Sequence, residues 1–254
     1  MENYTYWHKN TTDLRCPHCK KGYLTFDNKN SSEFQSEQNK RMSQFSMPDG
    51  SLEDDEEKYS GIISGYLECN HGDCVEKVSF VGQTEYQPDY FTDEDGDEHE
   101  HSVKTISFKY FIPPIHIVEL KHEYPPELQE ILEESFALYF ASPSACVNTL
   151  RILLEKLCEL NGIEKKKSDG DFKSLNKKLD ELIFDKSIKD LLEAAKWIGN
   201  DGSHSTETIT MKNTDLAYRF VVKALDLIYL EDDNQELQKQ AQAINKNKGI
   251  NKSK

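Results

Sequence analysis

The sequence predicts an α+β protein in which a small N-terminal β module precedes an all-α helical bundle. Four of the six cysteines occur in pairs before residue 75. β-Branched and aromatic residues alternate roughly between residues 59 and 120, as in strands, and after residue 124 the apolar residues recur at helical spacing. We therefore expect a β module over residues 1–122, a helical bundle over 123–232 and a polar, flexible tail over 233–254.

The acidity of the chain is concentrated in one region. The net charge is −15, from 31 basic and 46 acidic side chains, and residues 27–101 alone contain 20 acids and 5 bases. Within that region we expect two acidic insertions, 27–58 and 88–101. The first is expected to be mobile, because it has too few apolar groups to offset its ordering entropy. This acidity argues against a non-specific DNA coat, which neutralises phosphates with many cations.

The apolar pattern predicts a cytoplasmic protein without membrane contact. No apolar run approaches the ~20 residues of a membrane helix, and the N-terminus lacks a basic segment followed by an apolar core. The chain has only four arginines: Arg15, Arg41, Arg151 and Arg219. Because arginine is preferred for bidentate recognition of phosphates and bases, an extensive DNA-reading surface is not expected.

Several segments have the pattern of strands or helices. Strands are expected over 59–69, 75–86 and 102–120, and helices over 126–140, 142–161, 172–184, 187–198 and 215–230. The fourth helix is expected to end at Ile198, because Gly199 suits the left-handed position after a helix. The helical half has enough aliphatic residues for its own core, whereas the β module is small and needs an additional cross-link.

The paired cysteines have the spacing of metal ligands: C-x₂-C at Cys16 and Cys19, and C-x₄-C at Cys69 and Cys74. This pattern fits a four-thiolate zinc site of the ribbon type, and Zn²⁺ favours thiolate ligands. Disulfides and free thiols are the alternatives, and a cytosolic location disfavours disulfides. His18 and His71 are substitute ligands. We expect a closed, structural zinc site whose binding energy, on the order of 10 kcal/mol or more, stabilises the β module.

Three other groups of residues can be interpreted as structural or as functional. Cys146 and Cys158 are expected to be buried as small hydrophobes. Ser144, Asn148, Arg151 and Glu155 share one polar helix face, which is either a site or a solvated face with an Arg–Glu pair. The stretch from Lys196 to His204 either presents functional groups on a short turn or only ends the helix.

Several blocks of the helical half resemble a known family. PPIHIVEL, SPSACVNTLRILLEKLCELNGI, SLNKKLDELI and AAKWIGNDGSH are similar to the bacterial family called domain of unknown function 4145, over about residues 110–230. Many members of that family look similar in carrying an N-terminal zinc ribbon as well. The family is often found with restriction and phage-defence genes. The family looks like a relative of the HEPN bundles (higher eukaryotes and prokaryotes nucleotide-binding). The resemblance implies an HEPN-like bundle that forms a homodimer through its helices.

The same resemblance suggests catalytic residues. HEPN ribonucleases use an Arg-x(4–6)-His motif, in which the histidine moves protons and the cation stabilises the phosphorane without a metal. Here His204 matches the histidine and Asn200 matches a polar helper. The window for the arginine is occupied by residues 197–199, so the motif is not intact. Lys196 is the nearest cation, and Arg151 supplies a guanidinium only if it packs against residues 199–204.

These observations leave three functional hypotheses. The first is a zinc-binding, HEPN-like protein that acts as a nucleic-acid-associated or protein-interaction module in bacterial defence, with RNA or a defence-system protein as partner. The second is a metal-independent, homodimeric ribonuclease that uses His204, Asn200 and Lys196 or Arg151. The third is an acidic mimic of nucleic acid built on the stretch 27–101. The sequence has neither a phosphate-binding glycine loop nor a nucleophile elbow.

Overall fold

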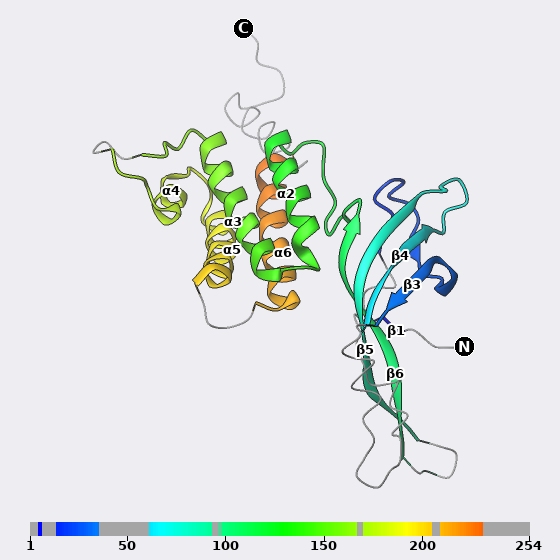
Figure 1. Cartoon of the computed structure of the whole chain (residues 1–254). Helices are drawn as coiled ribbons and strands as arrows, with labels where there is room; N and C mark the ends of the chain where they lie inside the picture. The colour runs from blue at the N-terminus through cyan, green and yellow to red at the C-terminus, as the bar shows by residue number, and fades with distance from the viewer. Residues whose placement is uncertain are drawn as a thin grey trace. The chain divides into compact units, whose positions relative to one another are not determined.

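The protein has an α+β fold, with a curled, mostly antiparallel sheet in its N-terminal part and helices in its C-terminal part (Figure 1). The computed structural model describes residues 5–6, 14–35, 61–92, 96, 98–166, 170–204 and 209–230. It forms two compact units: the β unit is Met1–Ile117 with Phe136–Ser142, and the helical unit is Val118–Ser135 with Pro143–Lys254. Among the described residues, no helix is both long and apolar enough to span a bilayer.

The sheet has six strands in the part of the chain that is described. They are β1 Thr5–Tyr6, β2 Leu24–Thr25, β3 Ser31–Phe34, β4 Gly61–Cys69, β5 Lys77–Thr92 and β6 Glu98–Ile112. The order is β1-β6-β5-β4-β2, and β3 also pairs with β4. Only β1 pairs in parallel, with β6. Along residues 77–85 of β5, exposed and buried side chains alternate strictly, which directs one face of the sheet toward a core.

The core of the β unit lies on that one face of the sheet. Its buried members are Cys16, Leu24, Ile63, Leu67, Val78, Phe80, Ile106, Phe108, Phe111 and Ile115. The rings of Phe80 and Phe108 meet edge to face with centroids 5.0 Å apart, a favourable geometry for aromatic pairs. Because Cys16 is part of this core, the cysteine motif and the sheet are packed together.

Part of the expected mobile insertion 27–58 is regular structure. A 3-10 turn, η2 (Asn28–Asn30), leads into β3, which pairs with β4. Glu33 on β3 accepts a hydrogen bond from Thr84 Oγ1 at 2.6 Å and forms an ion pair with Lys104. These side chains are only 17% and 9% exposed. A polar segment is therefore ordered by a nearly buried ion pair, which composition alone does not reveal; residues 36–58 lie outside the description.

The expected acidic loop 88–101 is largely a continuation of the sheet. The backbones of β5 and β6 pair through Pro88 with Ser102 and as far as Thr92 with Glu98. Strand pairing uses backbone groups and so does not depend on apolar side chains. The expected strand 102–120 is correspondingly shifted: β6 begins earlier and ends at Ile112, next to Pro113, which lacks a backbone donor.

The C-terminal part contains five helices in the described residues, as the periodicity predicts. They are α2 Pro126–Tyr139, α3 Pro143–Leu160, α4 Leu175–Glu181, α5 Lys186–His204 and α6 Met211–Tyr229. Gly162 follows α3 with a φ of +78°, as expected for a helix end. α4 is shorter than expected and starts after Ser174, whose side chain caps Lys177. α6 starts earlier than expected, after a capping box of Thr210 and Asn213.

Helix α5 does not end before Gly199 but continues to His204. A Cβ on Gly199 would lie 2.9 Å from the Cβ of Arg151 and 3.1 Å from the carbonyl oxygen of Val147. The glycine therefore lets α5 pack closely on α3 instead of stopping the helix. The prediction of a 199–204 turn was wrong, because a glycine that ends a helix and one that admits a neighbouring helix look the same in sequence.

Candidate metal centre and helical residues

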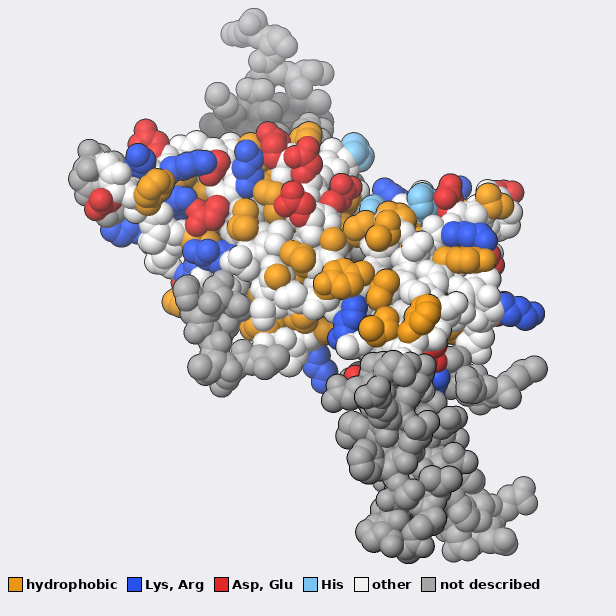
Figure 2. Space-filling model, in the orientation of Figure 1, with side chains coloured by type: hydrophobic (Ala, Val, Ile, Leu, Met, Phe, Trp, Pro, Cys, Tyr) orange, Lys and Arg blue, Asp and Glu red, His pale blue; other side chains and the backbone are white. Residues whose placement is uncertain are grey.

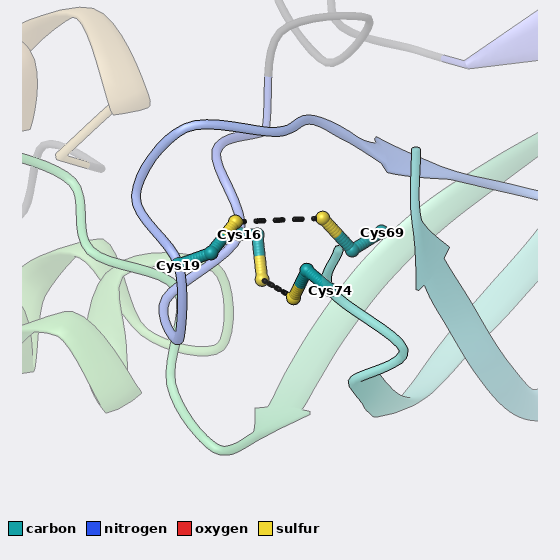
Figure 3. Close-up of side chains that lie close together, drawn as sticks. All are labelled: Cys16, Cys19, Cys69 and Cys74. Carbon is teal, nitrogen blue, oxygen red and sulfur yellow. Dashed lines mark hydrogen bonds between the residues drawn. The ribbon is translucent and has the colours of Figure 1, made fainter. Parts of the chain in front are cut away.

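The four paired cysteines converge at one end of the sheet (Figure 3). Their sulfurs all lie within 4.8 Å of one another. Cys16 Sγ is 3.9 Å from Cys74 Sγ, and Cys19 Sγ is 3.6 Å from Cys69 Sγ. A tetrahedron with Zn–S bonds of 2.3 Å has edges of about 3.8 Å. The arrangement can hold a metal ion, and all four cysteines are free of disulfides.

The first knuckle is the turn that carries Cys16 and Cys19. The amide of Cys16 donates to the carbonyl of Gly22 at 2.9 Å, and the amide of Gly22 donates to Cys19 Sγ at 3.3 Å. Lys20 adopts a positive φ of 57° to close the turn. A Cβ on Gly22 would lie 2.5 Å from Cys69 Sγ. Only glycine at this position lets the two knuckles approach each other.

The second knuckle follows β4. Cys69 is its last residue, and the amide of Cys74 donates to the carbonyl of His71 at 2.8 Å. The amide of His71 donates to Cys69 Sγ at 3.4 Å. Asn70 joins the two knuckles, because its Oδ1 accepts from the amide of Tyr23 at 2.8 Å. Backbone amides aimed at sulfur favour thiolates, the form in which cysteine binds metals.

The thiols of the cluster differ in acidity. The backbone amide of Gly22 lowers the pKa of Cys19 to about 6. Burial raises the pKa of Cys69 to about 12. Four thiolates this close together repel one another, so a bound cation is needed to hold all of them deprotonated. The donor set, the spacing and the amide hydrogen bonds all fit a soft divalent ion such as Zn²⁺.

The two neighbouring histidines are not part of the cluster. The sulfurs are grouped without any imidazole nitrogen among the described residues. His18 Nε2 instead lies 3.7 Å from Glu76 Oε2. His71 has a buried Nδ1 without a hydrogen-bond partner in the described part of the chain. The geometry therefore favours the four cysteines over either histidine as ligands.

Lys196, a suggested catalytic cation, is an internal contact of the helical unit. It is 2% exposed, and its Nζ donates to Asn176 on α4. The same nitrogen lies 3.5 Å from Glu193 Oε1 and 4.1 Å from the centroid of the Trp197 ring. Because Lys196 is deeply buried and bonded to Asn176, its role fits that of a residue that joins α5 to α4.

Arg151 lies where α3 meets α5. Its Cβ contacts Gly199, and its Nε is buried without a hydrogen-bond partner among the described residues. The alternative of an Arg–Glu pair on α3 is not seen, because Glu155 pairs with Lys178 of α4. Arg151 is thus a cation with unused hydrogen-bonding capacity beside α5.

Asn200 and His204 lie on the C-terminal part of α5. Asn200 is half-buried, one turn after Lys196. The backbone of His204 ends α5, and its side chain lies outside the description. The catalytic roles of all four residues remain hypotheses. Because residues 196–204 are helical throughout, Lys196, Asn200 and His204 lie on one rigid helix. The turn expected from the sequence would not have placed them on a single element.

Cys146 and Cys158 are fully buried, as expected. Cys146 Sγ donates to the carbonyl of Ser135 at 3.3 Å. Burial raises the pKa of Cys146 to about 11 and that of Cys158 to about 12. Both thiols are therefore protonated and unreactive at neutral pH.

Comparison with known families agrees with this division of the chain. Residues 133–247 match the family model Domain of unknown function (DUF4145). The chain contains a DUF4145 domain. The match begins within α2 and includes α3 to α6, so the resemblance recognised from sequence is confirmed. Residues 4–111, which carry the four clustered cysteines, match a second family model, Domain of unknown function (DUF8608). Searches of curated proteins and of solved structures returned no match.

Sequence reasoning missed the second family and two residues of the DUF8608 region that support the cysteine cluster. Gly22 had a readable signal, because a glycine shortly after C-x₂-C is typical of a tight knuckle. Asn70 had no comparable signal, since its contact with Tyr23 depends on how the two knuckles meet. In the DUF4145 domain, the contact of Asn176 with Lys196 likewise depends on tertiary packing.

Proposed function

We propose that the protein is a zinc-binding interaction protein. In this proposal Zn²⁺ on Cys16, Cys19, Cys69 and Cys74 stabilises the β unit. The DUF4145 domain is an HEPN-like bundle that acts as a nucleic-acid-associated or protein-interaction module in bacterial defence. The convergence of four sulfurs within 4.8 Å carries the zinc part of the proposal.

A non-catalytic helical domain is supported by the state of Lys196. A catalytic cation must reach the developing charge of a phosphate in the transition state. Lys196 is 2% exposed and bonded to Asn176. Releasing it would cost a buried hydrogen bond and expose its partner, so this lysine favours a structural role.

The zinc part is tested by metal analysis of the purified protein. Elemental analysis by inductively coupled plasma mass spectrometry is expected to find one zinc ion per chain in the wild type. Cys16→Ser and Cys69→Ser are expected to lose it, whereas Cys158→Ala, a cysteine outside the cluster, keeps it. Wild type without stoichiometric zinc, or a cluster variant that retains it, contradicts the proposal.

The interaction role is tested in cells challenged with phage. Expression of wild type is expected to lower the efficiency of plating. His204→Ala should protect as well as wild type, because no catalysis is required, whereas Cys69→Ser should not protect. A lack of protection by wild type against a broad phage panel, or its loss in His204→Ala, argues against this function.

The second candidate, a metal-independent ribonuclease, is favoured by one observation. Arg151 has a buried Nε without a hydrogen-bond partner in the described residues and packs against the helix that ends at His204. The test is cleavage of labelled RNA in the presence of a chelator. Activity that is lost in both His204→Ala and Arg151→Lys supports the enzyme. Equal activity in wild type and variants, or none in wild type, removes it.

A further inference from the structure

Among the described side chains, the face of the sheet opposite the core carries five exposed apolar ones, which we call the sheet patch. They are Phe34, 63% exposed; Ile62, 56%; Val81, 43%; Tyr110, 56%; and Ile112, 73%. Figure 2 shows hydrophobic side chains gathered over the strands on the face toward the viewer. Isolated exposed apolar residues need no explanation, but a contiguous group marks an interaction site.

Strand register makes the sheet patch contiguous. Phe34 of β3 is paired with Ile62 of β4, and Val81 of β5 is paired with Tyr110 of β6. Directly paired side chains have Cβ atoms about 5 Å apart. Ile112 follows Tyr110 by two residues and therefore points to the same face. The patch thus runs across four neighbouring strands.

The same face carries an ion pair. Glu68 is opposite Lys77 in the register and pairs with it at 3.1 Å. Lys77 also lies over the ring of Tyr66, with Nζ 4.0 Å from the centroid. In a chain with a net charge of −15, this pairing neutralises part of the charge on the face, to which exposed Glu85 also belongs.

The two ends of the sheet differ in charge. Residues 36–60 join β3 to β4 and carry a net charge of −4, and residues 86–103, which extend β5 and β6, carry −7. Both stretches start from one end of the sheet, because Gly61 is opposite Thr84 and Thr84 is opposite Ile106. The other end holds the first knuckle, whose exposed cations are Arg15, Lys20 and Lys21, next to the second knuckle and the exposed acids Asp73 and Glu76.

The size of the sheet patch fits a contact between two copies. The exposed fractions of its five residues correspond to roughly 500 Å² of surface, within the range of the largest patches on monomers, which are often functional. A stable interface buries about 800 Å² on each partner. A polar rim of moderate width around the sheet patch reaches that area, as in known interfaces with apolar centres and polar edges.

We propose that the sheet patch is the contact of a homodimer in which two copies pack sheet face against sheet face. The strands of the two copies run antiparallel across a two-fold axis, because this arrangement places the acidic end of one sheet beside the basic knuckle of the other. A parallel arrangement would bring the two acidic ends together. Stacked sheets lie ≈ 10 Å apart and keep their strands nearly aligned, and a two-fold contact is self-complementary.

The contact is tested by sedimentation equilibrium of the full chain. Wild type is expected to be dimeric at tens of micromolar. The double variant Ile62→Glu/Tyr110→Glu is expected to dissociate at least 100-fold more readily, since it places carboxylates in an apolar contact. Ile183→Glu is the matched control, because Ile183 is 99% exposed and lies in the helical unit, outside the sheet patch.

Circular dichroism and zinc content show whether each variant is folded, so a failure of the zinc proposal is distinguishable from a failure of this one. A monomeric wild type overturns the homodimer. Persistence of the dimer in the folded double variant also overturns it, because the copies then meet elsewhere, as through the helices. Dissociation of Ile183→Glu shows a charge effect without a sheet contact and overturns it as well.

The antiparallel orientation is tested by carbodiimide cross-linking of a mixture of ¹⁴N- and ¹⁵N-labelled chains. Mixed-isotope links are expected between Lys20 or Lys21 and carboxylates of residues 86–103. Their loss in Ile62→Glu/Tyr110→Glu ties them to the sheet patch. Links that occur only within one isotope, or none at all in a dimeric wild type, overturn the arrangement.

Discussion

The β unit and the helical unit keep their folds by different means. In the β unit, four cysteines from distant parts of the sequence meet at one end of the sheet, and a nearly buried ion pair between Glu33 and Lys104 holds β3. In the helical unit, leucines from α2 to α6 fill the interior and Gly199 admits α3. The first unit adds a few specific polar contacts to its apolar core, whereas the second depends mainly on many interchangeable apolar ones.

Removal of the zinc proposed for the cysteine cluster is the largest expected perturbation of this contrast. A strong chelator should unfold the β unit, because zinc binding contributes on the order of 10 kcal/mol to such small modules. The DUF4145 domain should keep its helices. Hydrogen exchange read by mass spectrometry is expected to show loss of protection in β4 and β5 with α3 and α5 unchanged. Loss of protection in both units at once would show that they are not independent.

Breaking the ion pair of the β unit should have the next largest effect. Lys104→Met removes one partner of a largely buried ion pair, which costs about 3–5 kcal/mol for such pairs. Urea unfolding of the purified protein measures the loss. The double variant Lys104→Met/Glu33→Gln should recover part of it, since the side chain that lost Lys104 is then neutral. An unchanged urea midpoint for Lys104→Met would show that the pair contributes as little to stability as a surface ion pair does.

Filling the space at Gly199 should have a smaller effect, confined to the helical unit. In Gly199→Ala the new methyl group would lie 2.9 Å from Arg151 Cβ, and overpacking of this kind costs about 1–3 kcal/mol. The higher helix propensity of alanine, worth about 1 kcal/mol, offsets part of that cost. The control is Gly72→Ala, where a Cβ meets no atom within 4 Å. A Gly199→Ala variant that gains the full ~1 kcal/mol of alanine's helix propensity over wild type would contradict close packing of α5 on α3.

The smallest effect concerns pH. Burial raises the pKa of Cys158 to about 12 from its ordinary value of 9.0, so folding favours the protonated thiol. This stabilisation is fully present below pH 9 and decreases as the pH rises toward 12. The free energy of unfolding of the helical unit should therefore decline above pH 9, less steeply in Cys158→Ala. Identical slopes for wild type and Cys158→Ala between pH 8 and 10.5 would refute this.

The sequence predicted the features that depend on local pattern. Helical periodicity indicated five helices, and Pro143 and Gly162 marked the limits of α3. The cysteine spacings predicted that Cys16 and Cys19 would meet the second pair, because metal-ligand motifs combine a short local turn with a recognisable donor set.

The errors arose where tertiary contacts outweigh local composition. β3 is polar in sequence, yet Glu33 finds Lys104 across the sheet. The distal parts of β5 and β6 are acidic, yet their backbones pair. Gly199 was taken as a helix end although its neighbour is α3. For Glu33 and Gly199 the deciding partner is far away in the sequence, beyond the reach of any window of periodicity. For the distal parts of β5 and β6 the partner is the facing strand, and its backbone pairing does not depend on an apolar pattern.

The chain separation within the cysteine cluster has a consequence for how related chains can vary. Cys19 and Cys69 are 50 residues apart and meet at 3.6 Å. The entropy cost of closing such a loop grows only logarithmically, by about 0.6 kcal/mol for each doubling of its length. Insertions or deletions between β3 and β4 therefore cost little while Cys16, Cys19, Cys69 and Cys74 are kept. Orthologues are free to lengthen or shorten that connection and still retain the same sulfur tetrad.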